Sequence, residues 1–307
     1  MAFEPDFRRI PGIQLQLGES PVWDARRQRL WFVDILRPAI GWHDPRTEEH
    51  GFHAMPAPVG CLALSNDRRL LLGLATGVHY FDPADGSFEF LVHPEPERPM
   101  NRLNDGRVGP DGHFWIGSMH DAMPRLPTGA LYRIAPDGIC TRVIDGICAS
   151  NGLAWSPDAT LMYHADSRAS SHAGRIMLHD FDAGTGAIRN GRILASPTED
   201  EGLPDGAAVD TDGVYWSAGL TAGCLNGFAP SGELVGKVAL PVEAPTMPCF
   251  GGNDLSTVFL TSLTRSGDIG SLSRMDIGRR GLPEPHFAAP SRARPRASAS
   301  EPFINPT

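Results

Sequence analysis

A weak internal repeat is the feature of this 307-residue sequence that most limits its possible folds. Six short apolar segments each follow a turn that contains an aspartate, and several of these turns use Pro, Gly or Ser, which favour tight turns. The segments are residues 29–33, 70–74, 113–117, 161–165, 214–218 and 257–261, and the aspartates are Asp24, Asp67, Asp111, Asp158, Asp212 and Asp254. Successive aspartates lie 43, 44, 47, 54 and 42 residues apart. A period of about 40–50 residues is typical of a four-stranded propeller blade.

The repeat therefore predicts an all-β fold, a six-bladed β-propeller of four-stranded antiparallel blades around a central metal-bearing channel. No long stretch has helical periodicity, which disfavours βαβ folds, whereas an irregular β-sandwich is the alternative that shares regularly spaced strands. We expect residues 1–282 to form this single domain, with residues 10–17 able to supply the outer strand of the last blade and so remove open sheet edges. Residues 283–307 are rich in Pro, Ala, Ser and Arg, and we expect them to form a peripheral or disordered tail that buries little surface.

Composition narrows the possible partners. The formal net charge is −9, from 27 Lys and Arg against 36 Asp and Glu, which disfavours nucleic acid because binding to phosphates depends on basic residues. The sequence contains no run of about 18 apolar residues, which excludes a transmembrane helix. The N-terminus has no apolar core of signal-peptide length. The 5 cysteines include no C-x-x-C pair, so a reduced, cytoplasmic chain is the simplest expectation. We therefore expect a small-molecule partner rather than nucleic acid or a membrane.

One position, repeated in every blade, carries polar side chains where apolar ones are normal. It lies four residues before the apolar residue that ends each predicted innermost strand, and its six members are Glu19, Gly60, Asn104, Asn151, Asp205 and Thr246. Equivalent positions of successive blades form a ring about the propeller axis, where the narrow channel normally selects small or apolar residues. Two carboxylates and two amides there suit a hard divalent cation, Ca²⁺, Mg²⁺ or Mn²⁺, with Zn²⁺ or Fe²⁺ possible. The alternative is that Asp105-Gly106, Asn151-Gly152 and Asp205-Gly206 are ordinary turn dipeptides.

These positions lie within motifs that resemble those of the gluconolactonase and regucalcin family, also called senescence marker protein/lactonase-like. The motifs are Leu-Gly-Glu-Ser-Pro-Val-Trp-Asp at 17–24, Asn-Arg-Leu-Asn-Asp-Gly at 101–106, Ser-Asn-Gly-Leu-Ala-Trp-Ser-Pro-Asp at 150–158, Pro-Asp-Gly at 204–206 and Pro-Thr-Met-Pro-Cys-Phe-Gly-Gly at 245–252. The resemblance implies a six-bladed propeller with one divalent metal ion at the axis, held by Glu19, Asn151 and Asp205. It also places Asn104 beside the metal, as a further ligand or substrate contact, and makes Arg102 a hydrogen-bond donor to substrate.

A second layer of residues follows from strand direction. If the inner strands start at the metal-bearing face, the second strands end there, bringing to its mouth Asp34, Met119, His120, Asp166, Ser167, Arg168 and Ser262. We assign Met119 and His120 to the substrate pocket, although a lone His in such a loop is more often solvated or hydrogen-bonded. Asp34 and Asp166 occupy equivalent positions, and approach to the site and a purely structural role are both open for them. Family members resembling regucalcin use an acidic residue in this region to bind sugar hydroxyls, whereas the best-aligned residue here is Ala122, with Asp121 adjacent. The substrate preferences of regucalcin-like members are therefore not expected to apply to this chain.

The resemblance implies an enzyme, a carboxylic ester hydrolase that converts a sugar lactone such as glucono-, arabinono- or xylonolactone to the aldonic acid. A divalent metal ion would polarise the lactone carbonyl and activate water, with Asp205 as the preferred catalytic base or with metal-held hydroxide in that role. Arg102 and Asn104 would orient the substrate. A phosphotriester or aryl-ester hydrolase is the second possibility and needs an apolar mouth, for which the candidates are Met119, Met123, Leu126 and Met247. A non-catalytic metal-binding propeller is the third.

Overall fold

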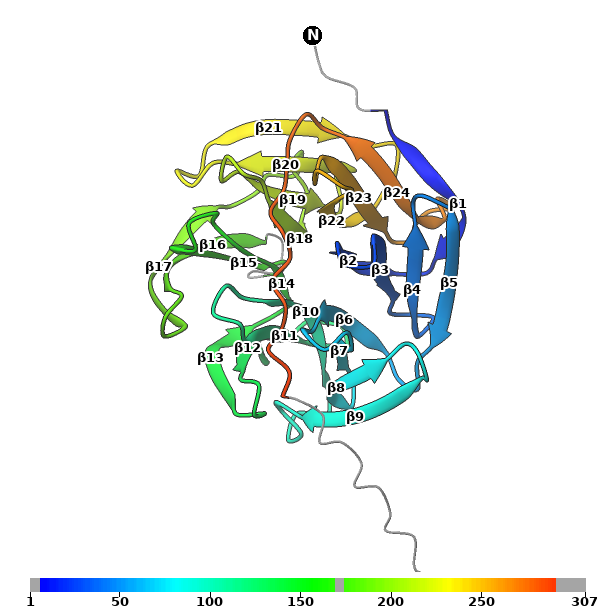
Figure 1. Ribbon diagram of the computed structural model, residues 1–307. Coiled ribbons are helices and arrows are strands. Elements are labelled where there is room, and N and C mark those ends of the chain that lie inside the picture. The colour runs from blue at the N-terminus through cyan, green and yellow to red at the C-terminus, as the bar shows by residue number, and fades with distance from the viewer. Residues whose placement is uncertain (1–5, 169–173, 291–307) are drawn as a thin grey trace, which may run out of the picture.

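The computed structural model describes residues 6–168 and 174–290, whose strands form six four-stranded antiparallel sheets around one axis (Figure 1). Blade 1 is β2 (Gly18–Asp24), β3 (Arg29–Asp34), β4 (Ala39–Asp44) and β5 (Glu49–Ala54); blade 2 is β6 (Val59–Leu64), β7 (Leu70–Leu74), β8 (Gly77–Asp82) and β9 (Ser87–Val92); blade 3 is β10 (Asn101–Val108), β11 (Phe114–His120), β12 (Gly129–Ile134) and β13 (Cys140–Ile147). Blade 4 is β14 (Ser150–Trp155), β15 (Leu161–Asp166), β16 (Arg175–Asp182) and β17 (Ala187–Ala195); blade 5 is β18 (Pro204–Val209), β19 (Tyr215–Gly219), β20 (Cys224–Phe228) and β21 (Leu234–Ala239); blade 6 is β22 (Pro245–Gly251), β23 (Thr257–Ser262), β24 (Gly270–Asp276) and β1 (Arg8–Leu15). The predicted six-bladed propeller is confirmed.

The predicted turns have a common structural basis. In five of them the aspartate side chain accepts a hydrogen bond from the backbone N–H two residues later, as expected of Asx turns; these are Asp24, Asp67, Asp111, Asp158 and Asp254. In blade 5 the predicted turn is present with Asp212 within it, but the equivalent side-chain acceptor is Asp210, which accepts from the Asp212 N–H at 3.0 Å. The apolar segment that follows each turn forms the second strand of its blade.

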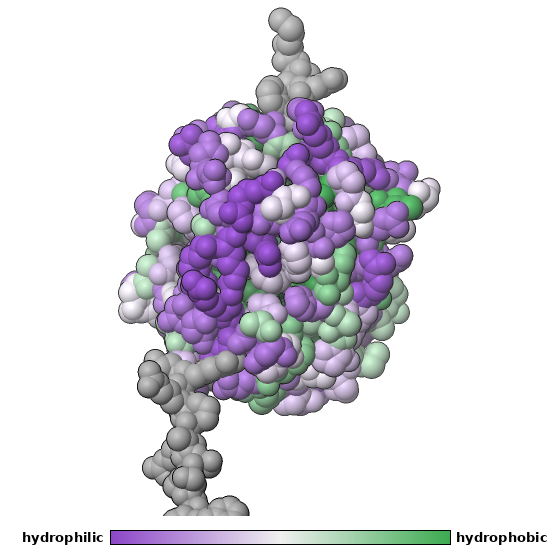
Figure 2. Space-filling view, turned by 45° about the vertical axis from the view of Figure 1, so that its right-hand side comes forward, coloured by the Kyte–Doolittle hydropathy of each residue, from purple (hydrophilic) through white to green (hydrophobic). Residues whose placement is uncertain are grey.

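The two ends of the propeller are joined within blade 6. β1 pairs antiparallel with β24, in a register that sets Arg8 opposite Arg274 and Leu15 opposite Gly270. The predicted closure is confirmed, with the strand starting two residues before the expected residue 10. Outer strands such as β5 are only partly buried, and Figure 2 shows one side of the molecule on which hydrophilic residues predominate and hydrophobic residues form separate spots.

The core consists of apolar clusters between neighbouring blades rather than within single blades. Trp31 packs in one cluster with Leu62 of the next blade, and Trp115 packs against Trp155 with ring centroids 6.0 Å apart. Equivalent clusters lie at the other four blade–blade interfaces of the described chain. Because each large side chain stabilises by about 1.5–3 kcal/mol when buried, the blades stabilise one another and hold the axial residues in fixed positions.

After β24 the chain crosses one end of the channel, as the orange-to-red segment in Figure 1 shows. We call residues 281–289 the C-terminal strap. Phe287 is fully buried against Tyr80, and its N–H donates to the Leu64 carbonyl at 2.9 Å. Composition predicts little burial beyond residue 282, but residues 283–289 pack on the propeller because one aromatic side chain reaches the core between blades 2 and 3. Residues 291–307 lie outside the described chain, and the boundary between residues 282 and 283 stays a prediction.

Two further features of the described chain bear on the sequence predictions. The five cysteines are all free. The described residues contain no helix with the length and hydrophobicity needed to cross a membrane.

Candidate active site at one end of the propeller axis

All six predicted ring positions lie at irregularities of the innermost strands. Register breaks fall between Glu19 and Val22, Val59 and Cys61, Leu103 and Gly106, Asn151 and Ala154, Pro204 and Ala207, and Pro245 and Met247. A β-bulge bends a strand and redirects its side chains, so this repeated irregularity turns the ring residues toward the axis. The alternative that Asp105-Gly106, Asn151-Gly152 and Asp205-Gly206 form turns is wrong, because all three pairs lie within strands.

The bulges are fixed by contacts to the neighbouring blade. Gly152 has a φ of +61°, and a Cβ there would lie 2.1 Å from the Tyr215 hydroxyl, which donates to the Gly152 carbonyl at 2.8 Å. In blade 1 the corresponding residue is Ser20, whose φ of 47° is unusual for a residue other than glycine. The Ser20 hydroxyl accepts from the Leu62 N–H at 3.0 Å and lies 3.3 Å from the Leu62 carbonyl. These contacts position the adjacent ring residues.

Two ring carboxylates share one buried environment. Glu19 and Asp205 are 8% and 7% exposed, and burial is the main cause that raises the pKa of each. The Asp205 charge further raises the pKa of Glu19, to well above its ordinary value. The pKa of Asp205 rises to about 7, through burial and then the neighbouring Asp105 charge, although Arg102 and Arg168 lower it. The site therefore holds negative charge that its own cations do not neutralise.

Asp105 is a third carboxylate that sequence reasoning missed. It lies within the β10 bulge beside Asn104, is 4% exposed, and accepts a hydrogen bond from the Leu153 N–H at 3.1 Å. Burial raises its pKa, and its charge acts on both Glu19 and Asp205. Its place next to a ring residue was the available signal, but an Asp-Gly pair suggests a turn when the bulge is unknown.

The amides and the predicted substrate donor form one hydrogen-bonded group. Asn104 Nδ2 donates to Asn151 Oδ1 at 2.7 Å, and Asn151 Nδ2 donates to Ser167 Oγ at 2.7 Å. Arg102 Nη1 donates to Asn104 Oδ1 at 2.6 Å, while its Nε donates to Asp121 Oδ1 at 2.9 Å. The structure thus brings Arg102, Asn104 and Asn151 together, with Asp121 holding the guanidinium from outside.

The remaining two ring positions do not present ligands. A Cβ on Gly60 would lie 2.4 Å from the Leu103 carbonyl, so only glycine permits the close approach of β10. Thr246 is fully buried and its Oγ1 donates to the Gly18 carbonyl at 2.6 Å, which ties blade 6 to blade 1. The site is therefore built from four of the six blades.

The second-strand residues divide into structural and peripheral groups. Asp34 accepts from the backbone N–H groups of Gln16 and Leu17, each at 3.0 Å, and Asp166 accepts in the same way from Cys148 and Ala149. Both carboxylates bind the backbone of the segment that leads into an inner strand. Their role in the structure is therefore to hold this backbone rather than to act as site ligands.

The two predicted pocket residues in β11 lie beside the ring. Met119 is buried opposite Arg102 in the β10–β11 register. His120 faces the Ala122 carbonyl, with its Nδ1 at 3.0 Å, and lines a neighbouring cavity of about 770 Å³ together with Asn101 and Leu126. Neither Glu19 nor Asp205 lines that cavity.

The chemistry of the ring fits a divalent cation held by oxygen atoms. The described residues contain no cluster of three or more His, Cys, Asp and Glu side chains placed to bind a metal, so the candidate ligand set combines two carboxylates with an amide. Glu19 and Asp205 supply carboxylate oxygens, and Asn151 supplies an amide oxygen. Within the described chain the Asp205 carboxylate accepts no hydrogen bond. Burial, and then the charge of neighbouring carboxylates, raises the pKa of both Glu19 and Asp205, and a cation would stabilise their charged forms.

Fold and ring together define a six-bladed β-propeller with an acidic site at one end of its axis. Residues 17–264 match the model of the SMP-30/Gluconolactonase/LRE-like region, and the chain belongs to this family, as predicted. It is 33% identical to regucalcin of Xenopus laevis over 252 residues, which cover 80% of this chain and 83% of that protein. It is 34% identical to the 6-deoxy-6-sulfogluconolactonase of Pseudomonas putida over 246 residues, with coverage of 80% and 83%.

A solved structure agrees with this assignment. Regucalcin of Agrobacterium tumefaciens, described as a calcium-binding protein, superposes with a TM-score of 0.87 at 26% identity, over 94% of this chain and 99% of that chain. The expectation of a carboxylic ester hydrolase of gluconolactonase type is confirmed at the level of the family.

Proposed function

We propose that the axial site hydrolyses a sugar lactone to its aldonic acid, with one divalent cation held by Glu19, Asn151 and Asp205. The observation that carries the proposal is the pair of buried carboxylates whose negative charge the surrounding residues leave uncompensated. The relative from Pseudomonas putida, named as a sulfogluconolactonase, supports a sugar lactone as the class of substrate. Glucono-, arabinono- and xylonolactone are the candidates to test first.

A divalent cation at this site would polarise the lactone carbonyl and make water more acidic. Oxygen ligands suit Ca²⁺, Mg²⁺ and Mn²⁺, with Zn²⁺ and Fe²⁺ as further candidates, and the calcium-binding Agrobacterium relative supports Ca²⁺. The chain orients the ligand side chains: the Ser20 N–H donates to Glu19 Oε2 at 3.1 Å, and Asn104 and Ser167 hold the Asn151 amide from its two ends.

The other site residues have separate roles in the proposal. Asp205 takes the proton from the attacking water, since its carboxylate is not used by a hydrogen bond within the described chain. Arg102 is held through Nε and Nη1, and within the described residues its Nη2 makes no hydrogen bond, which leaves that group for a lactone oxygen. Asn104 lies between Arg102 and Asn151 and helps to position the bound lactone relative to the two carboxylates.

The structure does not favour the aryl-ester or phosphotriester alternative. That activity depends on an apolar mouth, but Met119 and Met247 are buried, while Met123 is 70% exposed. Met123 and Leu126 lie between β11 and β12, and Leu126 lines the cavity beside His120, a cavity that neither Glu19 nor Asp205 lines. We retain the small-molecule lactone as the partner, and the cytoplasmic location, consistent with five free cysteines, stays a prediction.

Replacement of the proposed base tests the function. We expect Asp205→Ala to abolish proton release from every lactone that the wild-type protein hydrolyses, whereas Asp137→Asn, at an exposed turn, leaves turnover unchanged. Circular dichroism is the check that both variants are folded. Turnover of Asp205→Ala near the wild-type rate would overturn the assignment.

A further inference from the structure

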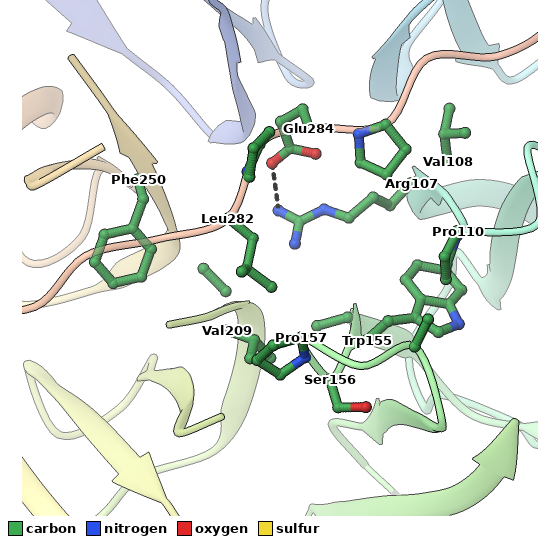
Figure 3. Close-up of a pocket in the computed structure, with 15 residues that line it drawn as sticks. Arg107, Val108, Pro110, Trp155, Ser156, Pro157, Val209, Phe250, Leu282 and Glu284 are labelled. Carbon is green, nitrogen blue, oxygen red and sulfur yellow. Dashed lines mark ion pairs between the residues drawn. The ribbon is translucent and has the colours of Figure 1, made fainter. Parts of the chain in front are cut away.

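A second cavity lies at the opposite end of the inner strands from the acidic ring. Its volume is about 230 Å³, and its walls come from the ends of β10, β14, β18 and β22 and from the C-terminal strap (Figure 3). Asn151 is the second residue of β14 and Trp155 the last, and the four residue steps between them span about 13 Å. No ring residue lines this cavity, so it is distinct from the proposed catalytic site.

The Arg107 side chain projects into this cavity, and in the described chain its guanidinium makes no hydrogen bond (Figure 3). It is 9% exposed, and neither its Nε nor its Nη2 has a hydrogen-bond partner in the described chain. Both nitrogens are closed off by surrounding atoms, so the accessible nitrogen of the guanidinium is Nη1, which makes no hydrogen bond in the described chain and points into the cavity (Figure 3). A cationic group in a mainly apolar cavity is costly without a hydrogen bond, so the unpaired Nη1 indicates a site for an anion.

Glu284 of the strap is the partner of Arg107 in an ion pair on the side away from Nη1. Its Oε1 lies 3.6 Å from Arg107 Nη2, which is an ion pair but is too long for a hydrogen bond. Nearby negative groups, Glu284 first, raise the pKa of Arg107 despite its burial, so the guanidinium is positively charged. Glu284 therefore competes for the same cation without occupying the hydrogen-bonding positions.

The rest of the cavity is mainly apolar. In Figure 3, Phe250 and Leu282 lie to the left of the guanidinium, and Val209 and Trp155 lie below it to the left and right. Ala154, Ala208 and several prolines complete the lining. A ligand here must therefore present an anionic group to Arg107 and hydrocarbon to the walls. A cavity of about 230 Å³ limits the ligand to a small acid.

We propose that this cavity binds a small monocarboxylic acid with an apolar body, held by Arg107 through Nη1. The aldonic acid product of the proposed lactonase does not meet these requirements, since its hydroxyl groups would lose water against Trp155, Val209 and Phe250 without finding partners. The site is thus a second binding function of the propeller, independent of the reaction at the ring. Because an incoming carboxylate repels Glu284, removal of that charge strengthens binding.

Calorimetric titration of the full-length chain with benzoate tests the proposal. We expect saturable binding at one site, with benzyl alcohol and gluconate weaker by about tenfold or more, since a charge-assisted hydrogen bond contributes ~1.5–3 kcal/mol. Arg107→Gln should weaken benzoate binding by a similar factor, and Glu284→Gln should strengthen it. The second variant keeps the guanidinium and moves the affinity in the opposite direction, so a general loss of folding cannot imitate it.

Three results would overturn the proposal: no saturable benzoate binding to the wild-type protein, unchanged affinity in folded Arg107→Gln, or no gain in Glu284→Gln. Each would leave Arg107 as an anchor for the strap alone. The readout does not use lactone turnover, so failure of the proposed catalytic function leaves this test intact.

Discussion

Replacing Asp205 by asparagine should stabilise the metal-free protein while it destroys the proposed site. Burial and neighbouring charge raise the pKa of this carboxyl from its ordinary 3.8 to about 7 in the folded chain. Since the folded state binds this proton more tightly, the wild type loses stability as the pH rises from about 3.8 to 7. The full loss is about 4 kcal/mol, at 1.36 kcal/mol for each unit of pKa. The neutral amide does not pay this cost, so Asp205→Asn gains stability over the wild type across the same range.

The assay is urea denaturation in excess chelator, between pH 4 and pH 8, with the difference in free energy of unfolding plotted for variant minus wild type. Taking the difference cancels the groups that titrate equally in both proteins. Asp137→Asn, at an exposed turn far from the ring, is the matched control for the removal of a carboxylate. A flat difference for Asp205→Asn would refute the conclusion that the ring carboxylates carry uncompensated buried charge.

Three further predictions follow from single features. Phe287→Ala should lower the free energy of unfolding by about 3–5 kcal/mol because the ring is fully buried under the strap, and a loss below about 1 kcal/mol in urea denaturation would contradict that packing. Burial lowers the pKa of His164 to about 3, so acid from pH 6.5 to 3 protonates the unfolded chain first and removes up to about 1.4 kcal/mol per pH unit; His164→Gln should reduce this slope in a pH series of denaturation curves. A cation at 100 times its Kd should stabilise the wild type by about 2.7 kcal/mol in thermal melts but should not stabilise Glu19→Gln, and equal stabilisation of both would exclude Glu19 as a ligand.

The parts of the fold that the sequence predicts are those encoded within one blade. An Asx turn followed by an apolar strand needs only neighbouring residues, so the aspartate period gives the number of blades. The same period gives the ring, because equivalent positions of a repeat meet at the axis. In blade 5 both Asp210 and Asp212 belong to the turn region, and only the structure shows that the Asp210 side chain accepts the hydrogen bond, from the Asp212 N–H.

The parts that the sequence does not predict arise between blades. A bulge is defined by the partner strand, so Asp105 could not be separated from a turn residue until the β10–β11 register was known. The contact of Phe287 with Tyr80 joins residues more than 200 positions apart, and an isolated Phe in a proline-rich segment carries no periodic signal. Arg107 likewise becomes notable only when the strap closes the cavity around it.

The measurement that tests the central claim most directly is proton release from a panel of pentono- and hexonolactones. Protein stripped by chelator is compared with protein reloaded with Ca²⁺, Mg²⁺, Mn²⁺, Zn²⁺ or Fe²⁺. We expect turnover that is lost on stripping and restored by at least one cation, and the ranking then names the preferred lactone and ion. Inactivity with every cation, in protein shown by calorimetry to bind metal, would contradict the proposed lactonase.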